Sequence, residues 1–84
     1  MKISAYSTRH KVYIQNDETT ECLARMSGNT YEIMQDSKCV DWVAYPRPPN
    51  IKHWNDFKNK IFKYFNFELD DSLIHNTTIL KDNS

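Results

Sequence analysis

The sequence predicts an α+β fold, a small antiparallel sheet of four to five strands with one long amphipathic helix (about 50–66) packed on one face. Two patterns predict it. Residues 2–45 consist of short segments in which apolar and polar side chains alternate, as in half-buried strands. Residues 51–65 instead repeat apolar side chains every three or four positions, which is the period of a helix with one buried face. In a small domain two such elements bury each other's apolar surface.

The first two predicted strands are short and cover residues 2–6 and 11–15, with a turn between them. The side chains that share their apolar face are Ile3 and Ala5 in the first strand and Val12 and Ile14 in the second. Lys11 and Tyr13 point to the other face, because successive side chains of a strand alternate.

Residues 20–26 alternate again, with Cys22, Ala24 and Met26 on one face. A short helix over residues 18–27, ending at Gly28, is the alternative. The period of two and the β-branched residues 19 and 20 favour the strand. Gly28, the only glycine, favours a hairpin turn into the next strand because glycine adopts positive φ at low cost.

That next strand covers residues 30–35, with Tyr31 and Ile33 on one face. A turn at residues 36–38 leads to residues 39–45, which form the most apolar segment of the predicted sheet. The side chains on its two faces are Val40, Trp42 and Ala44 on one side and Val43 and Tyr45 on the other. Apolar residues on both faces predict a central strand.

The prolines at 46, 48 and 49 end the sheet, and Asn50 is a suitable N-cap for the helix. The apolar arc of this helix is formed by Ile51, Trp54, Phe57, Ile61, Tyr64 and Phe65. Asn66 is predicted to end the helix, Phe67 and Leu69 to pack back on the domain, and residues 70–75 to form one more turn or a short strand. The predicted domain is 1–75, and 76–84 is a predicted frayed polar tail.

The length and composition fit one globular domain, since 84 residues leave room for a single core. Eleven basic and eleven acidic residues give zero net charge, which excludes bulk attraction to nucleic acid or anionic membranes. No stretch approaches the ~20 apolar residues of a membrane span, and the first residues lack the apolar core of a secretion signal. The expectation is a cytoplasmic protein that does not bind membranes.

Cofactor and enzyme chemistry have little support in the sequence. Cys22 and Cys39 are expected to be free, mostly buried thiols. A zinc site is the weaker alternative, and it would combine both cysteines with two of His10, His53 and His75. A metal-free nuclease would draw on His10, Glu21, Arg25, Glu32 and His53, but nothing in their spacing selects them. We therefore expect no enzyme activity, no cofactor and no metal.

Charge is segregated along the chain: residues 1–11 and 42–65 are basic, whereas 12–41 and 66–84 are acidic. Eight of the eleven aromatic residues lie in residues 42–67. Basic and aromatic side chains together suit a protein interface or a single-stranded nucleic acid. The candidate binding residues are Arg9, Lys11, Tyr45, Arg47, Lys52, Lys60, Phe62 and Lys63. Two plainer interpretations compete with this one, a solvated helix face for the lysines and the edge of the core for Phe62.

Lys, Asn, Ile and Tyr supply 28 of the 84 residues, which is typical of an AT-rich genome. With its compact length, aromatic content and lack of catalytic motifs, the chain resembles the small accessory (host-takeover or anti-defence) proteins of T4-like bacteriophages, in overall style and without a shared motif. This resemblance implies a non-enzymatic inhibitor in the host cell cytoplasm that binds a host nuclease, toxin or other defence factor.

An RNA or single-stranded DNA binding module is the alternative function. A homodimer is also expected, because an exposed sheet edge is often covered by self-association.

Overall fold

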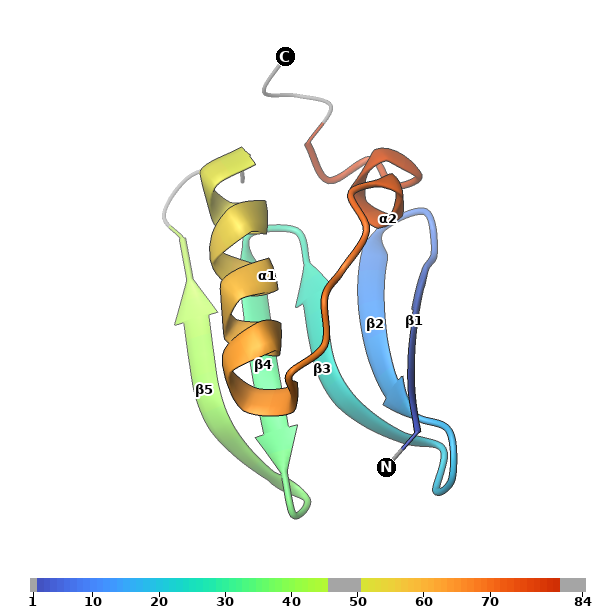
Figure 1. Ribbon diagram of the computed structural model, residues 1–84. Coiled ribbons are helices and arrows are strands. Elements are labelled where there is room, and N and C mark those ends of the chain that lie inside the picture. The colour runs from blue at the N-terminus through green and yellow to red at the C-terminus, as the bar shows by residue number, and fades with distance from the viewer. Residues whose placement is uncertain (1, 46–50, 81–84) are drawn as a thin grey trace.

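The computed structural model describes residues 2–45 and 51–80, which form a five-stranded antiparallel sheet with two helices on one face (Figure 1). The strands are β1 (Ile3–Ser7), β2 (Lys11–Asn16), β3 (Glu21–Ser27), β4 (Thr30–Gln35) and β5 (Lys38–Ala44), and their order in the sheet follows the sequence. The predicted α+β class is thus confirmed. The segment predicted as a strand at 20–26, with a helix over 18–27 as the alternative, is the strand Glu21–Ser27.

Each turn of this meander has a local cause. In the β2–β3 turn the Asn16 side chain accepts the amide of Glu18 at 2.9 Å. In the β3–β4 turn Gly28 has a φ of 57°, as the first residue of a two-residue hairpin often does. In the β4–β5 turn Asp36 and Ser37 both have positive φ, at 51° and 63°. The last two turns lie where the sequence predicts them.

The strand at residues 38–44 is an edge strand, so the prediction of a central position for it is wrong. β5 pairs only with β4, and the central strand is β3. One face of β5 turns toward the helix, and the other carries the exposed Trp42. The apolar residues on both faces of β5 therefore form one partly buried and one exposed surface.

Two β-bulges change which side chains face the core. The β2–β3 register shifts after Ile14, which leaves Leu23 as an extra residue, and the β4–β5 register shifts after Ile33, which leaves Val40 as one. Leu23 is consequently buried and Cys22 exposed, opposite to the predicted alternation. Both cysteines are free, as predicted, but both are exposed and not buried.

Helix α1 (Ile51–Phe65) lies on the face of the sheet formed by the apolar strand residues, and Trp54, Phe57 and Ile61 are buried against it. Asn66 follows the helix with a φ of 52°, as expected for the residue after a helix end. The predicted helix is confirmed over residues 51–65, and the predicted N-cap, Asn50, lies outside the described residues. Ile51, predicted to be apolar-facing, is 51% exposed.

The chain beyond α1 returns along the same face of the sheet. A single helical turn, α2 (Ser72–His75), buries Ile74, and Thr77 and Ile79 are buried after it. The amide of Thr78 donates to the carbonyl oxygen of Arg9 at 2.8 Å, which ties this segment to the β1–β2 turn. The predicted frayed tail is therefore too long, because residues 76–80 pack on the domain; residues 81–84 lie outside the described part.

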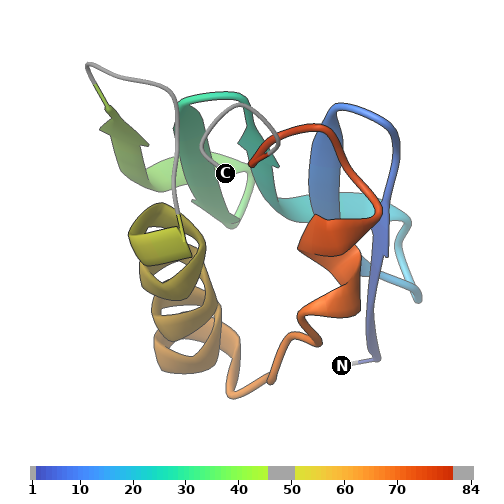
Figure 2. The ribbon, with the colours of Figure 1, turned by 90° about the horizontal axis from the view of Figure 1, so that it is seen from above.

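Both helices lie on the same side of the sheet (Figure 2). In residues 2–45 and 51–80 no element covers the other side, which we call the open face. The Cα radius of gyration is 12.0 Å, close to the ~12 Å of a compact single domain of this length. In the described ranges no helix has the length and apolar character needed to cross a membrane.

Candidate binding surface

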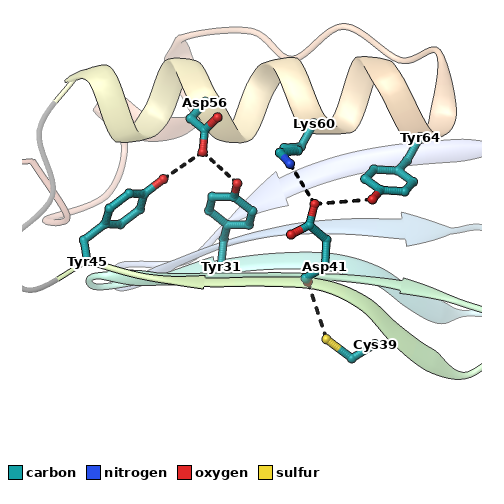
Figure 3. A network of polar contacts seen from close by, with 7 residues as sticks. All are labelled: Tyr31, Cys39, Asp41, Tyr45, Asp56, Lys60 and Tyr64. Atoms are coloured by element: carbon teal, nitrogen blue, oxygen red, sulfur yellow. Dashed lines mark hydrogen bonds and ion pairs between the residues drawn. The ribbon is translucent and has the colours of Figure 1, made fainter.

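The structure does not bring the sequence-predicted binding residues together into one patch. Lys60 donates to the Asp41 carboxylate of β5 at 2.8 Å and so is held against the sheet (Figure 3). Lys52 and Lys63 are exposed near the two ends of α1, about 16 Å apart along its axis. Lys11 lies on the open face, since its neighbour Val12 faces the core.

The remaining predicted residues are also dispersed. Arg9 is exposed in the β1–β2 turn, and Arg47 lies outside the described residues. Phe62 is 50% exposed on α1, beside a shallow hollow that is also lined by Lys58 and Glu68. Phe62 is therefore exposed and not part of the buried core, but no predicted basic partner of the site lies in that hollow.

Tyr45 is part of a polar network that joins the sheet to α1. Its hydroxyl donates to the Asp56 carboxylate at 2.9 Å, and the Tyr31 hydroxyl donates to the same oxygen at 2.7 Å (Figure 3). The ring of Tyr45 stacks on that of His53, with 3.7 Å between centroids. Tyr45 thus anchors the end of the sheet to the helix, and its ring and hydroxyl are both engaged.

Burial and the neighbouring Asp56 carboxylate raise the pKa of Tyr45 to about 12. The same two causes raise the pKa of Tyr31 above its ordinary value. The Lys60 ammonium lowers the pKa of Asp41, whose carboxylate also accepts the hydroxyl of Tyr64 at 3.3 Å. These shifts belong to contacts that hold β4 and β5 to α1.

The residues proposed as acid, base and cation of a nuclease are separated by the sheet. Arg25 forms an ion pair with Glu32 on the open face. His53 lies on α1 on the opposite side, and His10 lies in the β1–β2 turn, where its Nδ1 is 3.2 Å from the Thr78 hydroxyl. In residues 2–45 and 51–80 no group of three or more His, Cys, Asp or Glu side chains could hold a metal ion.

The open face instead carries one continuous line of large side chains. The strand registers place directly beside one another, from β1 to β5, Tyr6, Tyr13, Arg25, Glu32 and Trp42. We call these five residues the cross-strand row. The Tyr6 and Tyr13 rings stack with centroids 5.0 Å apart and an angle of 20° between their planes.

Exposure is greatest at the two ends of the cross-strand row. Trp42 is 60% exposed and Tyr6 is 45% exposed, which is unusual for rings of this size. The sequence predicts Trp42 in a central strand, and neither Tyr6 nor Tyr13 is among the predicted binding residues. The signal was present in the alternation, because Tyr6 and Tyr13 each occupy the face opposite the apolar residues of their strands.

The open face combines exposed aromatic rings with one ion pair. Its rings offer apolar contact area, and the Arg25–Glu32 pair offers hydrogen bonds of both kinds. Comparisons with protein-family models, with curated proteins and with solved structures found no match to this chain.

Proposed function

We propose that this chain is a non-enzymatic binding protein that antagonises a partner protein by covering it with the open face of its sheet. The observation that carries the proposal is the exposure of Trp42 in the cross-strand row. Trp, Tyr and Arg are the residues most enriched in the energetic centres of protein interfaces. Four of the five members of the row belong to these three types.

The charge of the row favours a protein over a nucleic acid as the partner. Arg25 is the only cation among the five residues, and it is paired with Glu32 on the neighbouring strand. A surface that follows phosphates needs unpaired cations, because phosphate contacts dominate nucleic-acid affinity. The row is neutral overall, which suits an interface with an apolar centre and a polar rim.

The inhibitory part of the proposal takes its support from the resemblance in overall style to the small accessory proteins of T4-like bacteriophages. A stable interface buries roughly 600–1,000 Å² on each partner, and one face of a five-stranded sheet is of that order. Attachment of such a domain to a host nuclease, toxin or other defence factor would cover its working surface without any chemistry. The site of action would then be the host cytoplasm.

The test compares two exposed apolar side chains on opposite sides of the molecule. Trp42→Ala is made on the open face and Phe62→Ala on α1, since Phe62 is 50% exposed and is not in the row. A partner captured from host lysate by the unaltered protein is purified, and its affinity for each variant is measured by calorimetry. We expect Trp42→Ala to weaken binding by roughly thirtyfold or more and Phe62→Ala by less than about threefold.

The opposite ranking of the two variants would place the interface on α1 and overturn the proposed surface. Failure to capture any protein that binds the purified chain would overturn the proposed partner class. Activity of the captured partner, measured with and without the chain, decides whether binding is inhibitory.

RNA or single-stranded DNA is the second candidate partner, and the stacked Tyr6 and Tyr13 rings favour it. Bases stack on exposed aromatic rings, and Lys11 lies on the same face as a cation for phosphate. Gel shifts with 15-nucleotide oligo(dT) and oligo(U) at 50 and 200 mM salt test this function. Binding that weakens steeply with salt and is lost in Tyr13→Ala would support nucleic acid over protein.

The homodimer stays a prediction. β1 and β5 are the edges of the sheet, and the open face is shared by every copy of the chain. Sedimentation equilibrium of the purified protein tests it, and a monomer at all concentrations would contradict it. Trp42→Ala distinguishes a dimer formed through the open face from one formed through a strand edge.

A further inference from the structure

The sheet is split at one end into two separate hairpins. β3 pairs with β4 only from Ser27–Thr30 to Ala24–Ile33. Beyond Ala24, β3 continues to Glu21 paired only with β2, and beyond Ile33, β4 continues to Gln35 paired only with β5. The two hairpins diverge toward the end that carries the β2–β3 and β4–β5 turns (Figure 1).

The bulges explain why the hairpins separate there. Both register shifts occur at the level where β3–β4 pairing stops, after Ile14 in one hairpin and after Ile33 in the other. A bulge increases the local twist and bends its strand. Two bulged hairpins that bend at the same level lose contact beyond it, which leaves two facing strand edges inside a single sheet.

A cleft of ≈ 580 Å³ lies between these edges, on the side of α1. Its apolar lining includes Leu23, Met34 and Phe65. A second hollow of ≈ 290 Å³ shares Leu23 and Met34 with this cleft and is also lined by Cys22. The two hollows are parts of one opening between the hairpins, which we call the inter-hairpin cleft.

Charge in the cleft has one sign. Among its nine described lining residues, Glu21 and Asp36 are carboxylates and none is a lysine or arginine. Both carboxylates are exposed, and they belong to the two different hairpins. A ligand that bridges the hairpins would therefore gain from a cation between the carboxylates and from an apolar stem along the lining.

We propose that the inter-hairpin cleft binds an extended, cationic peptide segment, with an arginine or lysine side chain inserted between Glu21 and Asp36. The aliphatic stem of that side chain packs on Leu23 and Met34, and the peptide backbone lies along the unpaired strand edges as an added strand. Arginine suits the site better than lysine because its planar guanidinium can contact two carboxylates at once. This inference rests on the proposed function only in taking the partner to be a protein.

The direct test uses a small peptide and not the unidentified partner. The blocked tripeptide acetyl-Val-Arg-Val-methylamide is titrated into the ¹⁵N-labelled protein and compared with the same peptide carrying citrulline, which has the shape of arginine without its charge. We expect amide shifts to concentrate at Glu21, Leu23, Met34 and Phe65. The citrulline peptide should bind roughly threefold to tenfold more weakly.

Matched variants test whether the peptide binds through a carboxylate of the cleft or through any exposed carboxylate of the protein. Asp36→Asn removes one charge and keeps a residue that tolerates the positive φ of this turn. This variant should bind the arginine peptide roughly threefold to tenfold more weakly, and its affinity for the citrulline peptide should be unchanged. Glu18→Gln makes the same charge change in the β2–β3 turn, on an exposed residue that does not line the cleft, and should have no effect on either peptide.

The two exposed cysteines supply an independent readout. Cys22 lines the opening, and Cys39 lies on β5 outside it. In single-cysteine variants the arginine peptide should slow alkylation of Cys22 and leave that of Cys39 unchanged. Partial burial raises the pKa of the Cys22 thiol, so each rate is compared with its own value without peptide.

Three outcomes would each overturn the cleft proposal. They are equal binding of both peptides, equal effects of Asp36→Asn and Glu18→Gln, and amide shifts centred on Trp42. These outcomes leave the proposed function intact, because its test depends on Trp42 and a captured partner. Conversely, peptide binding in the cleft together with failure of the Trp42→Ala test would retain the cleft and overturn the open face as the binding surface.

Discussion

Residues with positive φ in the tight turns reduce the stability of the folded protein, and substitutions there can either raise or lower its free energy of unfolding. Asp36 and Ser37 both adopt positive φ, and the left-handed conformation is unfavourable for residues with a Cβ atom. Glycine is the preferred second residue of this type of hairpin. The cost is therefore concentrated at Ser37, where no glycine is present.

Ser37→Gly is expected to raise the free energy of unfolding by about 0.5–1 kcal/mol, because it relieves the positive φ. The converse change, Gly28→Ala, should lower it by about 1 kcal/mol. An added Cβ at Gly28 meets no atom within 4 Å, so only backbone strain contributes. The urea midpoints of unfolding measure both changes, provided that the dependence of the unfolding free energy on urea concentration stays the same. A loss of stability in Ser37→Gly would contradict the turn geometry.

The Tyr45 hydroxyl predicts a loss of stability at alkaline pH. Its pKa is raised from 10.0 in the ordinary state to about 12 in the folded protein. The folded state thus holds the proton of this hydroxyl more tightly than the unfolded state does. The contribution of the hydroxyl to the free energy of unfolding is therefore complete below pH 10, and it is lost as the pH rises from 10 through 12. Urea midpoints from pH 8 to 12 measure it.

Asp56→Asn is the control for this titration. The amide oxygen still accepts a hydrogen bond, but the negative charge that opposes tyrosinate formation is removed. The pKa of Tyr45, followed by tyrosinate absorbance, should move back toward 10. An unchanged titration in this variant would mean that burial alone raises the pKa.

At the scale of elements, β5 is held on the sheet by β4 and on the helix by three polar links. The Tyr64 hydroxyl of α1 donates to Asp41. Lys60 reaches Asp41, and Tyr45, just beyond the strand, reaches Asp56. An edge strand has only one neighbouring strand, so these links to α1 take the place of a second one. We expect β5 to be the strand most sensitive to their removal.

Lys60→Met keeps the aliphatic stem and removes the ammonium from the half-buried Asp41. Amide hydrogen exchange in β5 should become roughly fivefold to tenfold faster, because opening of this strand costs less free energy. Lys58→Met is the matched control on the same helix, since Lys58 pairs with the 57% exposed Asp71 and not with the sheet. Equal acceleration of β5 exchange in both variants would contradict a specific link.

The existence of the elements could be predicted because periodicity is a local property. The strands of residues 3–35 and the helix of 51–65 follow from alternation and from the helical spacing of Trp54, Phe57 and Ile61. The place of β5 in the sheet could not be predicted. An apolar strand face buried by a neighbour and one left exposed for a partner have the same sequence pattern.

The cross-strand row and the inter-hairpin cleft could not be predicted from the sequence, because both depend on how the strands pair with one another. A bulge adds one residue and reverses the alternation beyond it, so the exposure of Cys22 and the burial of Leu23 could not follow from a strict period of two. The cross-strand row depends on register between strands, which the sequence of each strand does not contain. The pairing of Lys60 with Asp41 could not be predicted either, because lysine spacing on a helix does not reveal which ammonium groups find a carboxylate on the sheet.

At the scale of the whole molecule, the segment after α2 closes the end of the core. Ile79 is buried, and the amide of Thr78 is bonded to the carbonyl oxygen of Arg9, near the opposite end of the chain. The sequence suggested a loose end because residues 76–84 are mainly polar. Thr77 and Ile79 are nevertheless buried, and Leu80 packs against the core.

Ile79→Ala is therefore expected to lower the free energy of unfolding by about 2–3 kcal/mol, because it leaves a cavity in the core. Leu80→Ala, at a partly buried position next to it, should lower the free energy of unfolding by clearly less. Thermal unfolding followed by circular dichroism measures both. Equal, small effects would mean that the segment does not contribute to the cooperative unit.

The opposite placement of the two tryptophans gives the protein two separate optical reporters. The Trp54 indole is 0% exposed between helix and sheet, and that of Trp42 is 60% exposed on the bare side. Emission from the first should shift to the red only on denaturation, whereas the second should be quenched by acrylamide until a ligand shields it. Unfolding and occupancy could thus be followed in one unlabelled sample.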